Sequence, residues 1–546
     1  MRRTTLLLIL LGSATFFAGL GRPAIGDSDE AFYAEAAREM VASGDWITPY
    51  YNFETRFQKP ILFYWLVAGT YTVAGVNEAA ARVWPAVAGL GLALLTAAAG
   101  RRWYDEPTAR LGGMIVATAF GYFSIGRLSL PDLPLAFFIA LATWCALVGL
   151  CDRPARRAGW LLAAGAAVGL GFLTKGPLAV ILPLLVVAPL WWRERRGDPL
   201  PIGGLAAAAA LAALIAAPWF VAMARIHGLA YLEGFFIGDN VERFATARFN
   251  DPRPVWFYLP IVAGGLLPWT PLAVTAIAPA TAWLRRRQPP GPIAVRLLVW
   301  ALLPLLFFTA SIGKQPRYIL PILPPLALLL GRAVQLRVAR AGGGRDPLLR
   351  GAVVAIGILL VALGLLLYRA IPIIVMIDPA LVAAGAFAIV VAGTLVLAAS
   401  VMAPVRHLPI VVAAAGALTL LGLQYGLSPA GRDPVQDMAS LVLQHRQGGE
   451  RIATYRVFVR NLVFYTRVPQ QDLTSDDEAR AALRSPDPTL VIVGADELER
   501  IVSGTDLAPR RLGEVLYFNA SAVKLRTLLT PDPARDLERI LLVRNR

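Results

Sequence analysis

The stretch GWLLAAGAAVGLGFLTKGPLAVILPLLVVAPLWWRERRG, residues 159–197, contains two apolar runs that are joined by the turn TKGP and followed by a cluster of arginines. Each run, 159–174 and 178–192, is close to the length that crosses the hydrocarbon core of a bilayer. In lipid, a chain segment must satisfy its backbone polar groups internally, and a helix does so. The stretch therefore predicts two consecutive helices that cross a membrane in opposite directions.

Similar apolar runs recur along the chain, which is 57% apolar with a mean hydropathy of +0.59. We predict a mainly α, polytopic membrane domain over residues 1–427 with about thirteen transmembrane helices. The predicted spans are 4–20, 79–99, 110–126, 132–150, 159–174, 178–192, 203–223, 256–283, 293–311, 318–333, 350–369, 379–400 and 409–426.

Residues 428–546 are polar and of ordinary composition, which predicts a small α/β domain. RIATYR (451–456), TLVIVG (489–494) and RILLV (539–543) are strand-like, and helical patterns separate them. Ser475 and Glu478 have the spacing of a capping box and predict a helix start. No catalytic motif is visible here, so we expect a docking or lid domain.

The arginine-rich loops decide the expected topology. RRWYDEPTAR, CDRPARRA, RERRG and RRRQPP all face the cytoplasm with the N-terminus if residues 61–76 lie along the membrane interface rather than cross it. The segments 21–78 and 224–255 and the C-terminal domain are then external, or periplasmic. This arrangement also explains the net charge of +16 as a topology signal, so we expect no nucleic-acid partner.

Three acids, Asp27, Asp29 and Glu30, stand close together at the start of GDSDEAFYAEAAREM (26–40), in the first external segment. Asp27 and Glu30 have the spacing of a helix N-cap box, and Ser28 is an alternative cap. Capping accounts for one acid and not for three, so Asp29 and Glu30 are candidate catalytic carboxylates. Asp132 is a further external acid, which either caps a helix or contributes to a site. On the same first helix, Glu35 and Glu39 flank Arg38, and we expect these two acids to be solvated.

Lysine is rare in this arginine-rich chain. The four lysines are Lys59, Lys175, Lys314 and Lys524, and the first three occur beside proline, in QKP, TKGP and GKQP. A compact ammonium at an external turn suits a phosphate, while the alternative is interfacial snorkelling. The second external segment, FFIGDNVERFATARFNDPRPVWFYLP (235–260), carries Arg243 among aromatic residues. It is either an interfacial anchor or the wall of a cavity for a sugar and a lipid head group.

Together these features favour attack on a lipid-linked phosphate ester at the outer leaflet of the membrane. A polyprenyl phosphate is a good leaving group, so the site needs cations for the departing phosphate and a carboxylate base for a hydroxyl acceptor.

Four segments carry a resemblance to a known family. They are DEAFYAEAAREMVASGDWITP (29–49), RFQKPILFYW (56–65), FLTKGP (172–177) and SIGKQPRYILPILPPLALLLG (311–331). In order and spacing they resemble the bacterial membrane glycosyltransferases of the aminoarabinose transferase and protein O-mannosyltransferase type, within the GT-C superfamily. The resemblance covers about residues 4–340.

The resemblance implies an inverting glycosyltransferase of the bacterial inner membrane that uses a sugar carried on undecaprenyl or another polyprenyl phosphate. The acceptor is a lipid, a protein or a glycan. Asp29 matches the first-loop acid of the family, which is its usual base candidate, and Lys59 matches the lysine associated with the donor phosphate. We add a set of substrate-binding candidates from the external segments: Tyr33, Asp132, Arg243, Lys314 and Tyr318.

The sequence departs from the family at several positions. Phe32 stands where the family usually has an arginine that contacts the phosphate, and Gln58 replaces a glutamate. Asp239 and Asn240 occupy the place where a histidine often occurs. Metal ligands of some relatives are thus altered, so we predict no cofactor, with a divalent metal as the alternative. Two other readings stay open, a lipid or solute transporter or flippase and a relative without catalytic activity.

Overall fold

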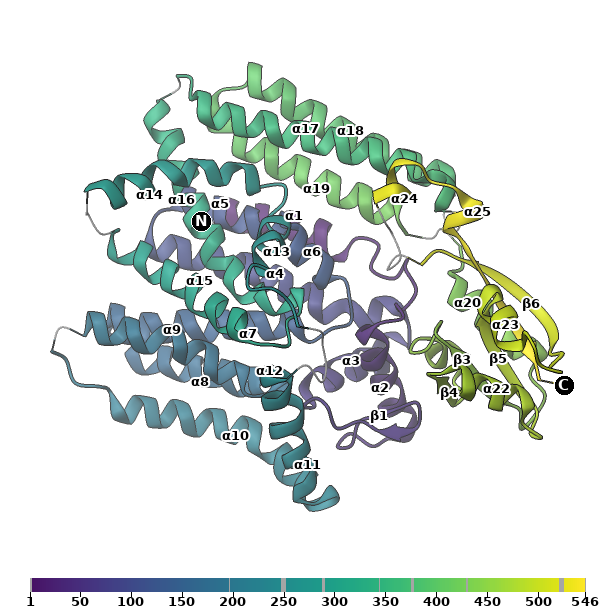
Figure 1. Ribbon diagram of the computed structural model, residues 1–546. Coiled ribbons are helices and arrows are strands. Elements are labelled where there is room, and N and C mark those ends of the chain that lie inside the picture. Colours follow the sequence, from purple (N-terminus) through teal and green to yellow (C-terminus); the bar gives the residue numbers. More distant parts are fainter. Residues whose placement is uncertain are drawn as a thin grey trace.

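The computed structural model describes residues 2–195, 197–246, 252–286, 290–342, 344–374, 378–428, 431–519 and 525–545. It has a large helical part and, beside it, a small domain that contains a five-stranded sheet (Figure 1). This architecture confirms the expected fold class.

Every apolar run predicted as a span lies on a helix or on consecutive helices. Within the described residues, nine helices are long and apolar enough to cross a membrane, and a tenth span results if Tyr258–Gly265 and Thr270–Ile277, which are bent by 108°, count as one. The nine are α4 (Glu78–Trp103), α7 with its π-helical extension (Asp132–Asp152), α8 (Arg157–Lys175), α10 (Ile202–His227), α15 (Pro292–Ala310), α16 with the 3-10 helix before it (Pro316–Ala341), α17 (Pro347–Arg369), α18 (Pro379–Met402) and α19 with the 3-10 turn before it (Val405–Gly426).

The count of about thirteen spans is not confirmed, because three of the predicted spans correspond to shorter helices. They are α1 (Arg2–Phe17), α5 (Glu106–Thr118) and α9 (Leu178–Glu194), with 16, 13 and 17 residues. A full crossing takes about 20 residues. In α5 the reason is a break at Ala119, after which α6 (Phe120–Gly126) continues in the predicted range.

Glycines bring α17, α18 and α19 close together at one side of the helical part (Figure 1). A Cβ atom on Gly393 of α18 would lie 2.7 Å from the carbonyl oxygen of Gly357 on α17. One on Gly385 of α18 would lie 2.5 Å from the carbonyl oxygen of Gly422 on α19. Small residues of this kind let apolar helices pack backbone against backbone, which is how helices associate in lipid.

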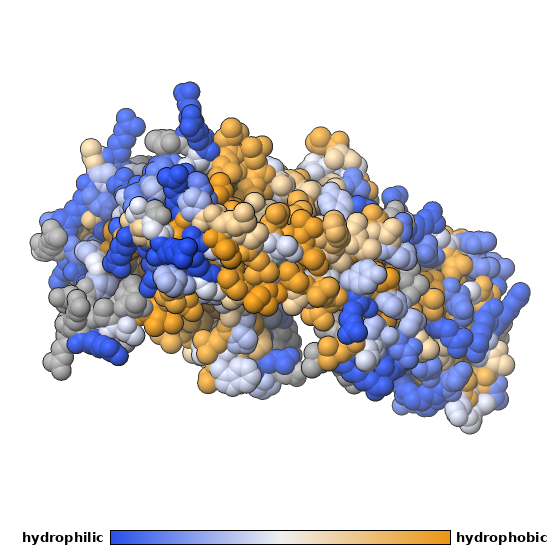
Figure 2. Space-filling view, turned by 90° about the horizontal axis from the view of Figure 1, so that it is seen from above, coloured by the Kyte–Doolittle hydropathy of each residue, from blue (hydrophilic) through white to orange (hydrophobic). Residues whose placement is uncertain are grey.

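One end of the helical part is held by ion pairs between arginine-rich loops. Arg296 near the start of α15 pairs with Asp152 and with Glu194, at 2.6 Å in each case, and Arg102 pairs with Asp152 at 2.8 Å. Three loops that share the predicted cytoplasmic side are thereby brought together. Figure 2 shows an apolar band across the molecule with hydrophilic residues on both sides of it.

The segment between α1 and α4 covers the other end. It contains α2 (Asp29–Ser43), a short hairpin of β1 (Tyr50–Tyr51) and β2 (Glu54–Thr55), and α3 (Leu62–Ala74). The 13 residues of α3 are too few to cross a bilayer.

The expectation that Glu35 and Glu39 of α2 are solvated is wrong. Glu35 is fully buried and accepts two hydrogen bonds from Arg38, at 2.6 and 2.7 Å. Glu39 is also buried, because the hairpin folds over it and Phe53 donates its backbone N–H to that carboxylate at 3.1 Å.

A buried ion pair joins this segment to the helices below it. Arg82 of α4 donates to Glu30 of α2 at 2.7 and 3.1 Å and also to the carbonyl oxygens of Leu20, Pro23 and Ala24. The Glu30 carboxylate additionally accepts the backbone N–H groups of Gly26 and Ser129. Both partners are almost fully buried, at 0% and 1% exposure. All their polar atoms therefore find partners from four separate segments.

The C-terminal domain has the strand order β4-β3-β5-β7-β6, in which β3 is parallel to β4 and β5, and β7 is antiparallel to β5 and β6. Its strands are β3 (Arg451–Tyr455), β4 (Gln470–Leu473), β5 (Thr489–Gly494), β6 (Arg510–Tyr517) and β7 (Glu538–Arg544). Alternate residues of the central strands pack on α20 (Pro434–His445) and α21 (Leu462–Thr466) on one face, and on α22 (Asp476–Arg484) and α23 (Ala495–Val502) on the other. Ser475 caps α22, as predicted.

The Arg82–Glu30 pair makes a prediction about stability. Arg82→Ala should lower the free energy of unfolding by about 3–5 kcal/mol, because it leaves a buried carboxylate without its counter-ion. Arg102→Ala is the matched control, since it removes a partly exposed pair that contributes about 1 kcal/mol or less. Thermal unfolding of the purified protein in detergent measures both variants. Equal, small losses would contradict the role of Arg82.

Candidate active site

Two acids and two cations from four segments meet at the end of the helical part that faces the C-terminal domain. Asp29 is the first residue of α2, Asp132 is the first residue of α7, and Lys175 is the last residue of α8. Arg317 lies in the 3-10 helix Pro316–Ile322 that leads into α16 (Leu323–Ala341). Helix termini converge here, so side chains distant in sequence become neighbours.

The four side chains form a continuous chain of charge. Lys175 Nζ lies 2.6 Å from Asp132 Oδ1, and Arg317 Nε lies 3.4 Å from the same oxygen. Arg317 also pairs with Asp29 through its Nη2 atom. The ring of Tyr318 lies beside Lys175, with its centroid 5.4 Å from the ammonium. Asp132 therefore does not cap its helix but forms ion pairs with two cations.

Asp29 is the accessible member of this group. Its side chain is 40% exposed, whereas Asp132, Lys175 and Arg317 are 4%, 11% and 17% exposed. Burial acts to raise the pKa of Asp29, but the adjacent Arg317, with help from Arg460 and Lys175, outweighs it and holds that pKa below its ordinary value. The site thus offers an ionised carboxylate to an incoming molecule, backed by buried cations.

The other two lysines of the proline-containing turns lie in different surroundings. Lys59 Nζ is 3.8 Å from Asp239 Oδ1 and donates to the carbonyl oxygen of Gln58 at 2.7 Å. Lys314 is 7% exposed and donates to the carbonyl oxygens of Ser311 and Arg253. Its ammonium thus holds the chain before α16 in place, so a phosphate role for Lys314 stays a prediction without geometric support.

Two neighbours of Asp29 have structural roles. Glu30, which we predicted to be catalytic, is fully buried against Arg82 and cannot reach a substrate. The capping role expected for Asp27 is also wrong, because Ser28 is the cap of α2 and Asp27 accepts the backbone N–H groups of Val459 and Arg460, at 3.1 and 2.7 Å. Asp27 therefore fastens the C-terminal domain to the start of α2.

The remaining predicted residues are placed as follows. Tyr33 is buried, with its ring 5.4 Å from that of Phe63 and 5.5 Å from that of Tyr64. Arg243 begins the short helix α12 (Arg243–Ala245), and its side chain lies outside the described residues. A search of the described residues finds no group of three or more His, Cys, Asp or Glu side chains with metal-binding geometry.

Comparisons with known proteins give this arrangement a family. Residues 8–228 match the family described as dolichyl-phosphate-mannose-protein mannosyltransferase. An undecaprenyl phosphate-α-4-amino-4-deoxy-L-arabinose arabinosyl transferase from Pseudomonas aeruginosa is 38% identical over 375 residues, which are 67% of this chain and 66% of that protein. A second such transferase, from Pseudomonas fluorescens, is 36% identical over 390 residues, or 67% of this chain and 68% of that protein. The chain belongs to this family of GT-C glycosyltransferases.

A solved structure extends the likeness to the whole fold. The crystal structure of ArnT from Cupriavidus metallidurans bound to undecaprenyl phosphate superposes with a TM-score of 0.75, at 23% identity, over 99% of this chain and 98% of that chain. The sequence alignments with the Pseudomonas transferases cover about two thirds of each protein, whereas this superposition covers nearly all of both chains. The GT-C fold is therefore shared along the full length.

Sequence reasoning did not single out Arg317, although it lies inside the family segment 311–331. The chain has 52 lysines and arginines, and the composition does not distinguish Arg317 from the others. The available signal was its place, directly after the GKQP turn that contains Lys314 and at the external end of a predicted span.

Arg317 makes the prediction of this site. Arg317→Ala should lower the rate of sugar transfer by roughly 10²–10³, because it removes a cation from a preorganised site. Arg332→Ala is the matched control, since Arg332 lies on α16, the helix that follows Arg317, and pairs with Asp105 near the arginine-rich end. Transfer by the purified variants, at equal protein amounts, is the measurement. A near-normal rate with Arg317→Ala would remove Arg317 from the active site.

Proposed function

We propose that the protein is an inverting glycosyltransferase that moves an aminoarabinose-type sugar from undecaprenyl phosphate to a phosphorylated lipid of the lipid A type. The observation that carries this proposal is the charged chain Asp29–Arg317–Asp132–Lys175, which combines an accessible carboxylate with buried cations. The names of the Pseudomonas relatives supply the sugar and the carrier, and family membership supports the same chemistry here.

In the proposed reaction an acceptor oxygen bonds to the anomeric carbon of the sugar while the bond from that carbon to the phosphate oxygen breaks. The polyprenyl phosphate leaves with the electron pair, and a single displacement of this kind inverts the anomeric centre. Lys175 and Arg317, together with Lys59 of the first loop, offset the charge that grows on the departing phosphate.

The role that we propose for Asp29 draws on its ion pair with Arg317 together with the direction of its pKa. A carboxylate whose pKa is held low by Arg317 is a weak proton acceptor and therefore a poor general base. A phosphate acceptor is already ionised near neutral pH and needs no base. Asp29 then orients the sugar or the acceptor, which favours a phosphorylated lipid over a protein or glycan hydroxyl.

The location of the charges argues against the transporter reading. Transporters bind their substrates near the middle of the membrane, often at broken helices. Here Asp29, Asp132 and Lys175 stand at helix ends, and Arg317 directly precedes α16. A reaction at the membrane surface suits this placement better than a pathway through the bilayer.

We further propose that the arginine-rich end faces the cytoplasm of a bacterial inner membrane and that the C-terminal domain is periplasmic. Supporting this, the arginine loops share one end of the helical part, whereas Asp27 ties the C-terminal domain to the end that carries Asp29. Positive charge is retained on the cytoplasmic side of membranes.

Alkaline phosphatase fusions test this orientation, because the enzyme is active only outside the cytoplasm. A fusion after residue 430 should be active, and a fusion near residue 105 should be inactive. The reverse pattern would overturn the orientation.

Lipid analysis tests the reaction itself. Lipids extracted from wild-type and deletion cells and compared by mass spectrometry should differ by loss of a pentosamine from a phosphorylated lipid in the deletion strain. Expression of the Asp29→Asn variant in the deletion strain should restore a substantial part of the modified lipid, because an ionised phosphate needs no base. An unchanged lipid profile on deletion would refute the proposed acceptor, and complete inactivity of Asp29→Asn would show that Asp29 is a base.

A further inference from the structure

Phe32, one turn of α2 after Asp29, carries two guanidinium groups on its ring. The Cζ atom of Arg56, from the chain just after β2, lies 4.0 Å from the ring centroid. The Cζ atom of Arg460, from the C-terminal domain, lies 5.4 Å from the same centroid. Residues three apart on a helix share a face, so both guanidiniums stand on the side of α2 that bears Asp29.

Neither arginine has a carboxylate partner within the described part of the chain. The hydrogen bond of Arg56 goes to an uncharged group, the hydroxyl of Tyr64, at 3.2 Å. Arg460 contributes to the electrostatic lowering of the pKa of Asp29, whose carboxylate is paired with Arg317. Two cations near one ring repel each other, and an anion bound between them offsets that repulsion.

Stacking leaves the binding edge of a guanidinium available. A guanidinium that lies over an aromatic face keeps its N–H groups at the periphery, where they match the oxygens of a phosphate. The ring of Phe32 therefore orients two guanidinium groups without neutralising their positive charge.

The structure holds Arg460 in this place with several contacts. Asp27 accepts the backbone N–H groups of Val459 and Arg460, and the hydroxyl of Tyr51 donates to the carbonyl oxygen of Arg460 at 3.1 Å. The ring of Tyr51 also packs edge-on against Phe32, with centroids 4.6 Å apart. The loop that presents Arg460 contains two non-glycine residues with left-handed backbone, Arg456 (φ 62°) and Phe458 (φ 53°). Backbone strain of this kind persists where the surroundings enforce it, often at functional sites.

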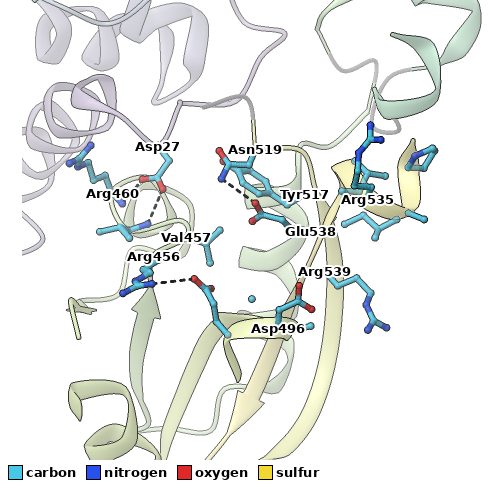
Figure 3. A pocket seen from close by; sticks show the side chains of 18 residues that line it. Asp27, Arg456, Val457, Arg460, Asp496, Tyr517, Asn519, Arg535, Glu538 and Arg539 are labelled. Carbon is cyan, nitrogen blue, oxygen red and sulfur yellow. Dashed lines mark hydrogen bonds and ion pairs between the residues drawn. The ribbon is translucent and has the colours of Figure 1, made fainter. Parts of the chain in front are cut away.

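A polar cavity of about 1150 Å³ begins beside this loop. Asp27 and Arg460 lie together at its edge, and Tyr517, Asn519 and Glu538 line its interior (Figure 3). Sites for small molecules have volumes of roughly 300–1,000 Å³. The cavity therefore has room for a polar head group whose phosphate lies at Arg460.

We propose that Arg56 and Arg460 together bind a phosphate group of a substrate next to Asp29, so that the C-terminal domain completes the substrate site. This inference rests on the proposed function, because it assigns a substrate group to the same site. The phosphate belongs either to the polyprenyl carrier or to the acceptor lipid, and both present the same chemistry.

The test compares Arg460→Ala and Arg56→Ala with Arg484→Ala, an exposed arginine on α22 that does not line the cavity. For each purified protein, the KM values for sugar carrier and acceptor are measured, together with direct binding of undecaprenyl phosphate and of a phosphorylated lipid A. Arg460→Ala should weaken binding of one of these molecules by roughly tenfold or more, since a charge-assisted hydrogen bond is lost. Arg460→Lys should recover only part of the lost affinity, because an ammonium lacks the planar pair of N–H donors of a guanidinium.

The outcomes separate the two sources of phosphate. A raised acceptor KM with unchanged carrier binding places the acceptor phosphate between the arginines, and the opposite pattern places the carrier phosphate there. If all values for Arg460→Ala equal those of Arg484→Ala, the inference is overturned. A wild-type protein that transfers no sugar would refute the proposed function instead, and the binding measurements would still decide the role of Arg460. The backbone contacts of Arg460 persist in the alanine variant, and an unchanged unfolding temperature would show that it folds.

Discussion

The buried pair of Glu30 and Arg82 organises the end of the molecule that carries the candidate active site. Removing two charges from water is costly, and their mutual attraction compensates only when every remaining donor and acceptor is satisfied. Here that condition is met by backbone groups of the chain after α1, the turn before α2 and the loop before α7. The pair therefore fixes the positions of these segments relative to one another. Asp29, the residue before Glu30, owes its position to it.

The other charged residues of the site are held in place by the ends of helices rather than by loops alone. α7 begins at Asp132 and α8 ends at Lys175, and both helices are packed along their length. The charges at their termini are thus held as firmly as the helices themselves. Preorganised cations of this kind are effective because they need no rearrangement when negative charge develops. The accessible carboxylate of Asp29 is then the member of this array that we propose to meet the substrate.

The sequence predicts those features whose causes are local. Apolar runs identify the spans, and β3, β5 and β7 read as strands because they lie in the middle of the sheet and are apolar. The edge strands β4 (QQDL) and β6 (RRLGEVLY) escaped notice, since an edge strand is partly solvated and keeps polar residues. The sequence presents Lys175 as one of three turn lysines and does not indicate that it is the one that joins Asp132. Its partner lies 43 residues away, and no pattern within a window of one helix reports such a contact.

The three acids at the start of α2 show how one short stretch serves three purposes. Successive residues on a helix point about 100° apart, so neighbours in sequence face different surroundings. Glu30 points into the helical part and meets Arg82, whereas Asp29 points to the side where Arg317 lies. Asp27 precedes the helix and is free to turn toward the C-terminal domain, 432 residues further along the chain. The spacing of Asp27 and Glu30 does resemble a capping box, but Ser28 performs the capping with a shorter side chain. Because Ser28 takes that role, all three carboxylates remain available: one for the core, one for the site and one for the domain that brings Arg460 to it.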